Sequence, residues 1–354
     1  MLFKLIVLTS QFRMQKERTI SAIYHLLKGK QSIQTIQDAH LFQLEKYYGI
    51  YKNLTSQRFF EIVNKCEKDG LVVKEGHYYG VTTTGEYWLN NHKALLQELS
   101  LDGIKFRKMD QLFFSRLLLL IQVWTNSKMT HFKFIPIIEH KEVEQWVRLY
   151  YQKTKNNLDH YLHTLYEEFI RLLSSLPTSH TNIFINQLTG YKSFGLSLEQ
   201  LATKYKMSKE DIHLITVSVL HFMLLSILEN KEQYPLLYSF KEDLHKEDVL
   251  TDSAKVTKKL LQSGLTITQI ANNRRLKENT IYDHIVEMAH NDQSFPLSTY
   301  VHLSAQQQII RAVEQIQSFK LKDIKLAVSK EITYFQIRLV LARWNHFDKR
   351  REES

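Results

Sequence analysis

The chain has 354 residues, of which 44% are hydrophobic and 24% are charged. These values are ordinary for a soluble globular protein of two or three domains, and they exclude a largely disordered chain. The formal net charge of +10 favours an anionic partner, with nucleic acid as the first candidate.

The positive charge lies mainly in the two ends of the chain. Lys and Arg outnumber Asp and Glu by 13 to 9 in residues 1–100 and by 16 to 11 in residues 251–354, but only by 18 to 17 between them. The terminal segments are therefore the candidates for contact with an anionic partner.

The composition also predicts the fold class. Only 10 Gly and 4 Pro occur among abundant Leu, Lys, Gln and Glu, which indicates a mainly α, multi-domain chain. We expect a winged-helix-like domain with a small β-hairpin at 1–100, a helical middle domain at 101–250, a helix-turn-helix domain at 251–346 and a tail at 347–354.

Three helices followed by a hairpin are predicted in the first domain. Apolar periodicity indicates helices at 17–28, 32–47 and 55–69, and alternation indicates strands at 71–74 and 77–81 around a Glu75–Gly76 turn. Thr83 and Glu86 have the spacing of a capping box that opens a further helix.

This order of elements is typical of a winged helix, in which the third helix enters a DNA groove and the hairpin follows the backbone. The candidate contacts on the helix and the wing are Gln57, Arg58, Lys65, Lys68, Lys74 and His77. Acidic residues interrupt the same surface, so a winged helix that binds only protein is the alternative. These residues are Glu61, Glu67, Asp69 and Glu75.

The middle domain is predicted to be helical and nearly neutral. Periodicity indicates helices at 110–125, 139–152, 158–176, 195–205 and 209–230. Residues 212–228 are apolar on nearly every face, which is typical of a buried central helix. The balanced charge suggests a scaffold or a docking surface for a partner.

The most informative stretch is 251–290, which has the pattern of a helix-turn-helix. Helices are expected at 253–261 and 268–273, with a turn at Gly264, and a third helix is expected from the break near Leu276 to about Ala289. Three more helices follow at 306–318, 321–328 and 333–344, the last opened by a Thr333–Gln336 capping box.

A helix-turn-helix presents the start of its last helix to the DNA major groove. We expect Arg274, Arg275 and Lys277 to contact phosphates, and the outward-facing Asn279, Thr280 and Tyr282 to contact bases or an exposed fork. Glu278 and Asp283 lie on the same predicted face and argue against strong base recognition, because carboxylates repel the DNA backbone.

The apolar template of this motif occurs three times. Ala271 is followed by Leu276 and Ile281 at offsets of five and ten residues. The same offsets separate Ala202, Met207 and Ile212, near 196–228, and Ala327, Ile332 and Ile337. Helix-turn-helix units are therefore predicted as a recurring building block of the chain.

Two segments carry a family resemblance. Residues 252–343, with SAKVTKKLLQSGLTITQIANNRRLKENTIYDHI and LKDIKLAVSKEITYFQIRLVLARW, resemble the helix-turn-helix domain at the C-terminus of RecQ-type helicases. The opening RTISAIYHLLKGKQSIQTIQDAHLF and the overall length resemble the YpbB-like proteins of Firmicutes. These proteins are often encoded beside a short RecQ-type helicase, so the resemblance implies such a helicase as a partner.

No motif for catalysis or cofactor binding is present. The sequence lacks a GxxxxGK[ST] phosphate loop, a GxGxxG motif between a strand and a helix, and a GxSxG elbow. His160, His163, Glu167 and Glu168 could meet on one helix face, but without a further placed ligand they favour a polar stripe over a metal site. We therefore predict a protein that is not an enzyme and has no cofactor.

A cytoplasmic location without membrane insertion is expected. The single cysteine, Cys66, excludes an internal disulfide and lies on an apolar helix stripe, where a buried core position is expected. The first ten residues do not form a convincing signal peptide, and the apolar run at 113–124 is too short to span a bilayer.

Three functions are compatible with these patterns. The leading hypothesis is a non-catalytic accessory protein that binds duplex, single-stranded or forked DNA and tethers or assists a RecQ-type helicase in DNA repair or recombination. The alternatives are an adaptor whose helix-turn-helix folds dock proteins without contacting DNA, and a transcriptional regulator. A regulator would need a ligand pocket or a dimer helix, and neither is evident from the sequence.

Overall fold

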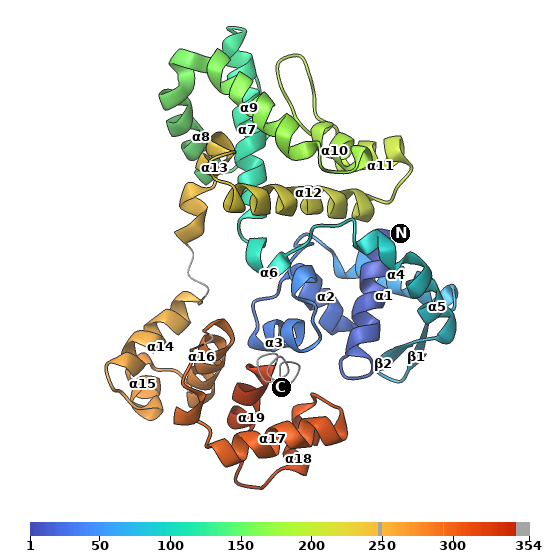
Figure 1. The fold of residues 1–354 in the computed structure, drawn as a ribbon, viewed down its shortest axis with the longest axis vertical. Coiled ribbons are helices and arrows are strands. Elements are labelled where there is room, and N and C mark those ends of the chain that lie inside the picture. The colour runs from blue at the N-terminus through green and yellow to red at the C-terminus, as the bar shows by residue number, and fades with distance from the viewer. Residues whose placement is uncertain (247–249, 293, 345–354) are drawn as a thin grey trace.

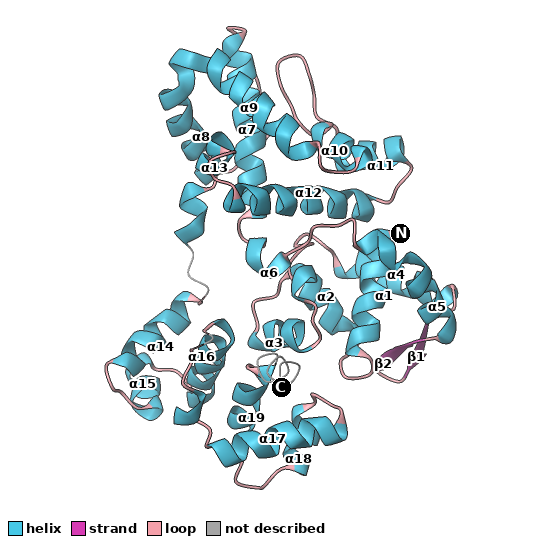
Figure 2. Cartoon of the chain, in the orientation of Figure 1, coloured by secondary structure: helices cyan, strands magenta, loops and turns pink. Residues whose placement is uncertain are grey.

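The computed structural model describes residues 1–246, 250–292 and 294–344, and in this part of the chain it confirms a mainly helical, multi-unit fold. The sheet among the described residues is a single two-stranded antiparallel hairpin near the N-terminus (Figures 1 and 2). The predicted tail at 347–354 lies outside the described residues, as do residues 345 and 346.

The N-terminal part is the predicted winged helix with one additional helix before it. Helices α2, α3 and α4 precede the hairpin, as expected. The elements are α1 (Leu2–Met14), α2 (Ile20–Lys28), α3 (Ile33–Leu41), the 3-10 helix η1 (Glu45–Tyr47), α4 (Ser56–Lys68), β1 (Val72–Glu75), β2 (Tyr78–Val81), α5 (Thr83–His92) and η2 (Lys93–Leu96).

Three local predictions in this part are wrong. Helix α3 ends at Leu41 rather than continuing to 47, because Gln43 adopts a left-handed conformation with φ 52°. Glu75 pairs with Tyr78, so the two turn residues are Gly76 and His77. The cap of α5 is Thr82, whose hydroxyl accepts the N–H of Gly85, and not Thr83.

Helix α1 was not predicted, because its apolar residues show no single face. Nine of its side chains are buried, and they contact several elements at once. Helix α1 packs against α12, α5 and β2, so most of its length is buried, although Phe12 and Arg13 near its end are exposed.

The middle part is built around one long apolar helix, α12. Helices α6, α10 and α13 and the 3-10 helices η3 and η4 were not predicted, whereas α7, α8, α9, α11 and α12 match predicted helices to within a few residues at their ends. The elements are α6 (Gly103–Phe106), α7 (Asp110–Lys128), α8 (Lys141–Thr154), η3 (Lys155–Asn157), α9 (Leu158–Leu173), α10 (Thr178–Ile185), α11 (Leu198–Tyr205), α12 (Lys209–Glu229), α13 (Pro235–Ser239) and η4 (Glu242–Lys246).

Helix α12 connects the two hydrophobic cores of the molecule. Its first half, including Ile212 and Ile215, belongs to a core that it shares with the terminal domains. Its second half, including Met223 and Ile227, belongs to the core of the middle domain. The helix has the length and hydropathy of a membrane span, but 72% of its most apolar window is buried within the protein, which confirms the predicted central helix.

The C-terminal part contains the six predicted helices. Its first three helices match the predicted boundaries to within about two residues. The elements are α14 (Asp252–Gln262), α15 (Ile267–Arg274), α16 (Glu278–Asn291), η5 (Leu297–Thr299), α17 (Leu303–Ile316), α18 (Leu321–Ala327) and α19 (Tyr334–Leu341).

The N-terminal domain lies between the middle and the C-terminal parts (Figure 1). On the C-terminal side, His40 of α3 stacks on His290 of α16 with ring centroids 5.2 Å apart. Nearby, Phe319 packs edge-on against Phe42, and its backbone N–H donates to the Glu17 carboxylate at 3.0 Å. The N-terminal and C-terminal parts of the described chain thus share one packed interface.

This interface contains a histidine that burial keeps neutral. Burial, with the nearby His40, Arg338 and Arg343, lowers the pKa of His290 from 6.5 to about 3. The Nε2 atom of His290 has no hydrogen-bond partner among the described residues, so no neighbouring acceptor compensates a proton there.

We expect acid to destabilise this interface through His290. The unfolded histidine takes up a proton below pH 6.5 and the folded one does not, so lowering the pH from about 7.5 to about 5 should cost up to about 2 kcal/mol. His290→Gln should therefore show a smaller fall in Tm over this range, as measured by circular dichroism. The exposed His302→Gln is the control, and an equal effect of both substitutions would contradict the assignment.

Candidate nucleic-acid interface

The structure confirms that the first two copies of the repeated template share one backbone geometry. Helices α11 and α15 both have eight residues and both begin with a Ser or Thr capping box. Both end in a left-handed residue with φ 53°, Lys206 in one and Arg275 in the other. The next N–H donates back to the template alanine, Met207 to Ala202 at 3.0 Å and Leu276 to Ala271 at 2.9 Å.

The third copy has a different turn. Helix α18 ends at Ala327, and the next residue, Val328, is extended. In the first two copies the helix continues to a left-handed residue four positions after the alanine. The following helix still begins after a cap at the same offset, Thr333, with the predicted capping box to Gln336. The apolar spacing therefore predicted the helix pair but not the geometry of its turn.

A fourth turn of the same kind occurs in the winged helix and was missed in the sequence. Gln43 is left-handed, and the N–H of Leu44 donates to the carbonyl of Ala39 at 2.7 Å. The offset from Ala39 to Leu44 is the same as that from Ala271 to Leu276, which is the first offset of the apolar template. The second step is absent because position 49 is a glycine and α4 begins only at Ser56.

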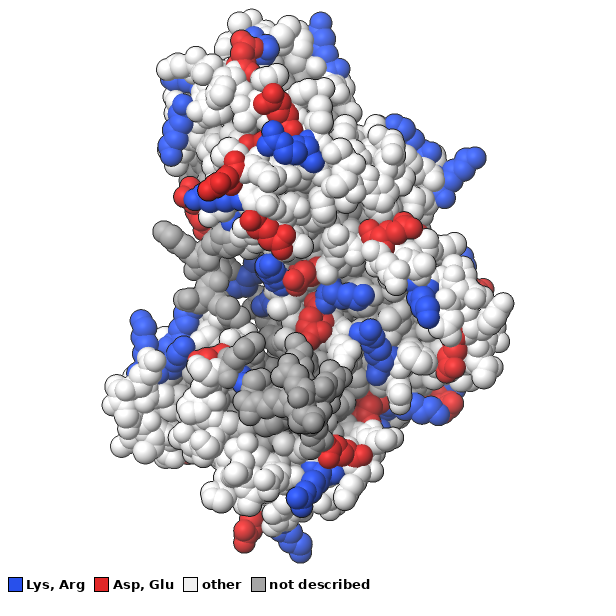
Figure 3. Space-filling model, in the orientation of Figure 1, with Lys and Arg blue, Asp and Glu red and all other residues white. Residues whose placement is uncertain are grey.

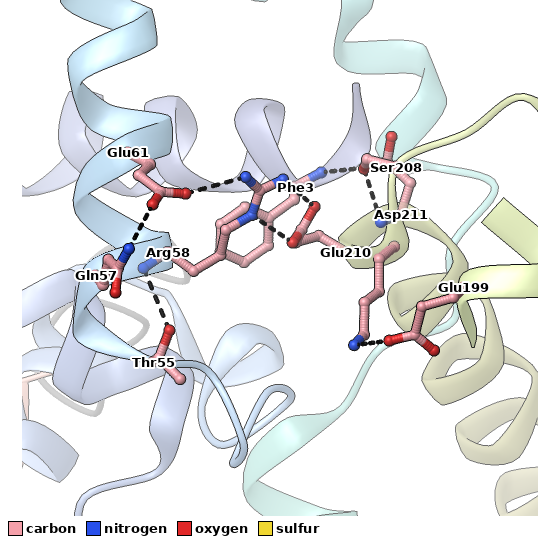
Figure 4. Close-up of polar contacts among 10 residues, drawn as sticks. Phe3, Thr55, Gln57, Arg58, Glu61, Glu199, Ser208, Glu210 and Asp211 are labelled. Atoms are coloured by element: carbon pink, nitrogen blue, oxygen red, sulfur yellow. Dashed lines mark hydrogen bonds and ion pairs between the residues drawn. The ribbon is translucent and has the colours of Figure 1, made fainter. Parts of the chain in front are cut away.

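In the α11–α12 copy, which lies in the middle domain, the second helix would be the one to face DNA, but its first turn contacts the N-terminal domain instead. Glu210 in the first turn of α12 is 4% exposed, and its carboxylate accepts hydrogen bonds from Arg58 of α4 at 2.7 and 3.0 Å (Figure 4). The adjacent Asp211 accepts the backbone N–H of Phe3 at 2.9 Å. The start of α12 is therefore occupied by the N-terminal domain.

This contact determines the environment of Arg58, which was predicted to contact DNA. The guanidinium also pairs with Glu61 at 3.1 Å, and Gln57 donates to the same carboxylate at 3.0 Å. Burial raises the pKa of Glu210, but the bonds from Arg58 outweigh it and lower the pKa below its ordinary value. Arg58 and Gln57 are thus held by carboxylates.

The remaining predicted contacts of the winged helix are open to solvent. Lys65 on α4 and Lys74 on β1 are exposed, and neither forms an ion pair among the described residues. Two of the nearby acidic residues are paired with lysines in or just after α1, since Lys16 pairs with Glu75 and Lys4 pairs with Asp69 at 2.6 Å. The positive surface of this module is therefore reduced to isolated lysines.

The α15–α16 copy has a basic helix start without a side-chain cap. Lys277 is the N-cap of α16 and makes no side-chain cap hydrogen bond, in contrast to Ser208 of α12 and Thr333 of α19. Arg275, Lys277 and Asn279 are exposed, and Thr280 is half-buried beside them. Free N–H groups at a helix start and adjacent cations together favour a phosphate.

The two acidic residues near this helix start are both engaged. Glu278 accepts a hydrogen bond from Thr268 of α15 at 2.5 Å. Asp283 pairs with Arg338 of α19 at 2.6 Å. Arg338 therefore balances the charge of Asp283, whereas the exposed Glu278 keeps its charge beside Lys277 and opposes a DNA backbone.

Tyr282 and Asp283, which were predicted to face outward, are partly exposed but also contact α19. Tyr282 stacks on Phe335 of α19 with ring centroids 4.3 Å apart, and Asp283 faces the same helix through Arg338. Helix α16 is packed against α14, α15, α19 and α3, so its first turn is the part left open.

Arg274 also differs in orientation from the prediction. Its guanidinium lies against the start of α14, where it donates to the carbonyl of Ser253 at 2.8 Å, to the Ser253 hydroxyl at 2.9 Å and to the Thr257 hydroxyl. Arg274 therefore holds α15 to α14, whereas its neighbour Arg275 points into solvent.

The polar stripe on α9 separates into two environments. His163 pairs with Glu167 at 3.3 Å on the surface, whereas Glu168 is buried and accepts the N–H groups of Leu236 and Leu237 at 2.9 Å. Among the described residues, no group of three His, Cys, Asp or Glu could hold a metal ion. Cys66 is buried as predicted, and burial raises its pKa to about 11.

Comparison with known proteins supports the C-terminal assignment. The sequence model of a family described as a helix-turn-helix domain matches residues 253–341, which suggests DNA binding. The chain is similar to Protein YpbB of Bacillus subtilis (strain 168), with 29% identity over 346 residues, which cover 96% of this chain and 97% of that protein. No solved structure gives a significant match. The link to RecQ-type helicases stays a prediction.

The two neighbouring arginines should respond differently to substitution. We expect Arg274→Ala to lower the free energy of unfolding by about 1–3 kcal/mol, because it leaves polar groups on α14 without their donor. Arg275→Ala should change it by less than about 0.5 kcal/mol, since the exposed side chain has no described partner. Urea unfolding followed by tryptophan fluorescence measures both, and equal losses would contradict this distinction.

Proposed function

We propose that the protein is a non-catalytic, cytoplasmic DNA-binding accessory factor that holds DNA for a RecQ-type helicase during repair or recombination. The proposal has two parts, a DNA contact made by the C-terminal helix-turn-helix and a protein contact made by the middle domain. Each part has its own supporting observation and its own test.

The DNA contact rests on the first turn of α16. Among the three repeated units, this is the helix start that has a lysine cap, no side-chain cap bond and exposed cations on both sides of the turn. The other two starts are capped, and that of α12 carries Glu210 and Asp211 in internal contacts. This difference supports the α15–α16 turn as the unit that contacts a phosphate backbone.

The mode of binding we propose is mainly electrostatic. Base recognition in a major groove needs a row of side chains along the exposed face of a helix. In α16 that row is interrupted after Thr280, because Tyr282 and Asp283 pack on α19. Phosphate contacts from Arg275 and Lys277 remain, and such contacts depend strongly on salt and weakly on sequence.

Fluorescence anisotropy with labelled duplex DNA over a salt series tests the DNA contact. Arg275→Ala with Lys277→Ala should weaken binding by about tenfold and reduce the salt slope by about 2, because two phosphate contacts are lost. The matched control is Lys153→Ala with Lys155→Ala in the middle domain, which removes the same charge from two exposed positions. Binding by the unmodified protein that did not depend on salt would contradict an electrostatic tether.

The same experiment separates the other functions. Undetectable DNA binding by the intact chain would favour the adaptor, and tight binding to one operator sequence would favour a transcriptional regulator. The adaptor has one observation in its support. Residues predicted to face DNA, Arg58 and Tyr282, are used for docking within the molecule, which shows that these folds can serve protein contacts.

The protein contact is supported by exposed apolar side chains on the middle domain. Phe132 is 68% exposed, Ile135 83% and Phe194 84%. The segment that carries Ile135 is fixed in place, since the buried amide of Gln122 donates to the carbonyl of Ile135 and accepts the N–H of Ile137, both at 3.0 Å. Ordered, exposed apolar side chains of this kind are typical of protein-binding surfaces.

Co-purification with a RecQ-type helicase tests the partner separately. We expect Phe132→Ser with Ile135→Ser to reduce capture of the helicase without changing affinity for duplex DNA. Tyr87→Ser, which alters an exposed aromatic residue of the N-terminal domain, is the control. Absence of capture by the unmodified protein would remove the helicase from the proposal and leave the DNA contact in place.

A further inference from the structure

The C-terminal domain has a second basic feature, separate from the α15–α16 turn. It is a groove of about 830 Å³ between α14, the end of α16 and the segment that follows it. We call it the α14 groove, and its lining includes Lys255, Lys258, Lys259, Asp292, Phe295 and Tyr300.

The charge of the groove favours an anion. Three lysines come from one face of α14, whereas Asp292 is the carboxylate in the lining, and two hydrogen bonds from Ser294 hold its oxygen. Lys255 pairs with Asp252 at 2.8 Å, which leaves Lys258 and Lys259 as the other two lysines of the lining. Lys and Arg side chains gather over α14 at the left edge of Figure 3.

Part of the groove lining, which we call the aromatic wall, is formed by two stacked rings. Phe295 and Tyr300 stack with ring centroids 5.6 Å apart and an interplanar angle of 14°. Both side chains are partly exposed, and Tyr300 is fixed from behind by an edge-on contact with Phe335. Aromatic rings fixed in this way offer a surface on which a flat base can stack.

We propose that the α14 groove binds single-stranded nucleic acid, with the backbone along Lys258 and Lys259 and a base against Tyr300 or Phe295. Its volume lies in the range of about 300–1,000 Å³ that is usual for ligand sites. A duplex keeps its bases inside a convex rod, whereas a single strand can place a base in a concave site. The combination of cations and a stacking surface therefore selects the unpaired form.

The position of the groove relates it to the proposed duplex contact. Arg274 holds the end of α15 against Ser253 and Thr257 at the start of α14. The basic turn at Arg275 and Lys277 thus lies at one end of α14, and the groove follows the same helix toward its other end. This inference rests on the proposed function and adds a preference for DNA in which a duplex adjoins a single strand.

Anisotropy with a labelled oligothymidine of about 12 nucleotides and with a duplex, both with the full chain, tests the groove. Lys258→Glu with Lys259→Glu should weaken oligothymidine binding by about tenfold or more and change duplex binding by no more than about twofold. The matched control, Lys153→Glu with Lys155→Glu, changes the charge equally at exposed sites on the middle domain. Equal losses of oligothymidine affinity in both variants would mean that only the net charge of the protein matters, and would overturn the proposal.

The aromatic wall has an independent test. Tyr300→Leu should weaken oligothymidine binding by about fivefold or more, and Tyr300→Phe should leave it unchanged, because only the first removes the ring. Thermal unfolding of each variant confirms that it is folded. Unchanged binding by Tyr300→Leu would overturn the stacking contact.

The unmodified protein separates the two proposals. Binding of duplex without any binding of oligothymidine would reject the groove and leave the proposed function standing. Binding of neither DNA would reject both.

Discussion

The structure depends on the burial of α12, whose first half belongs to one hydrophobic core of the described residues and whose second half belongs to the other. Its apolar side chains pack into these cores along its length, and its first turn contacts the N-terminal domain. Burying Glu210 and Asp211 is unfavourable unless each finds a donor, and Arg58 and the backbone of Phe3 supply them. This requirement fixes where α4 and α1 lie relative to the middle domain, and hence which face of the winged helix remains open.

The repeated units show how one backbone geometry can take different roles. The turns after α11 and α15 agree in length, capping, left-handed residue and return hydrogen bond. They differ in the residues that begin the next helix. The second and third residues of α12, Glu210 and Asp211, are buried carboxylates with internal donors, whereas α16 has Asn279 and Thr280 at these positions and its first residue, Glu278, stays exposed. The chemistry of one helical turn is therefore sufficient to separate a scaffold unit from a candidate DNA-binding unit.

These contrasts also show what the sequence could and could not predict. Periodicity and capping residues are local signals, so most helices, the hairpin and the buried state of α12 were predictable. Helix α1 was not, because a helix buried on all sides has no polar face to define its period. Arg274 and Arg275 are neighbours of the same type, and only the position of Ser253, 21 residues away, determines which one is engaged. The partner of Arg58 is 152 residues distant, and no local pattern specifies such a pair.

The packing around α16 limits how the helix-turn-helix can meet DNA. A recognition helix normally lies along the major groove with several turns free, but α16 is enclosed by α14 and α15 on one side and by α19 and α3 on the other. The contact with α3 joins it to the N-terminal domain through the stacked histidines. Freeing the helix would require separating Phe335 from Tyr282 and opening the interface between the chain's two ends, which buries aromatic and apolar side chains. Because that cost opposes insertion, DNA would meet the protein at the tip of α16 and along α14, where the cations already face solvent.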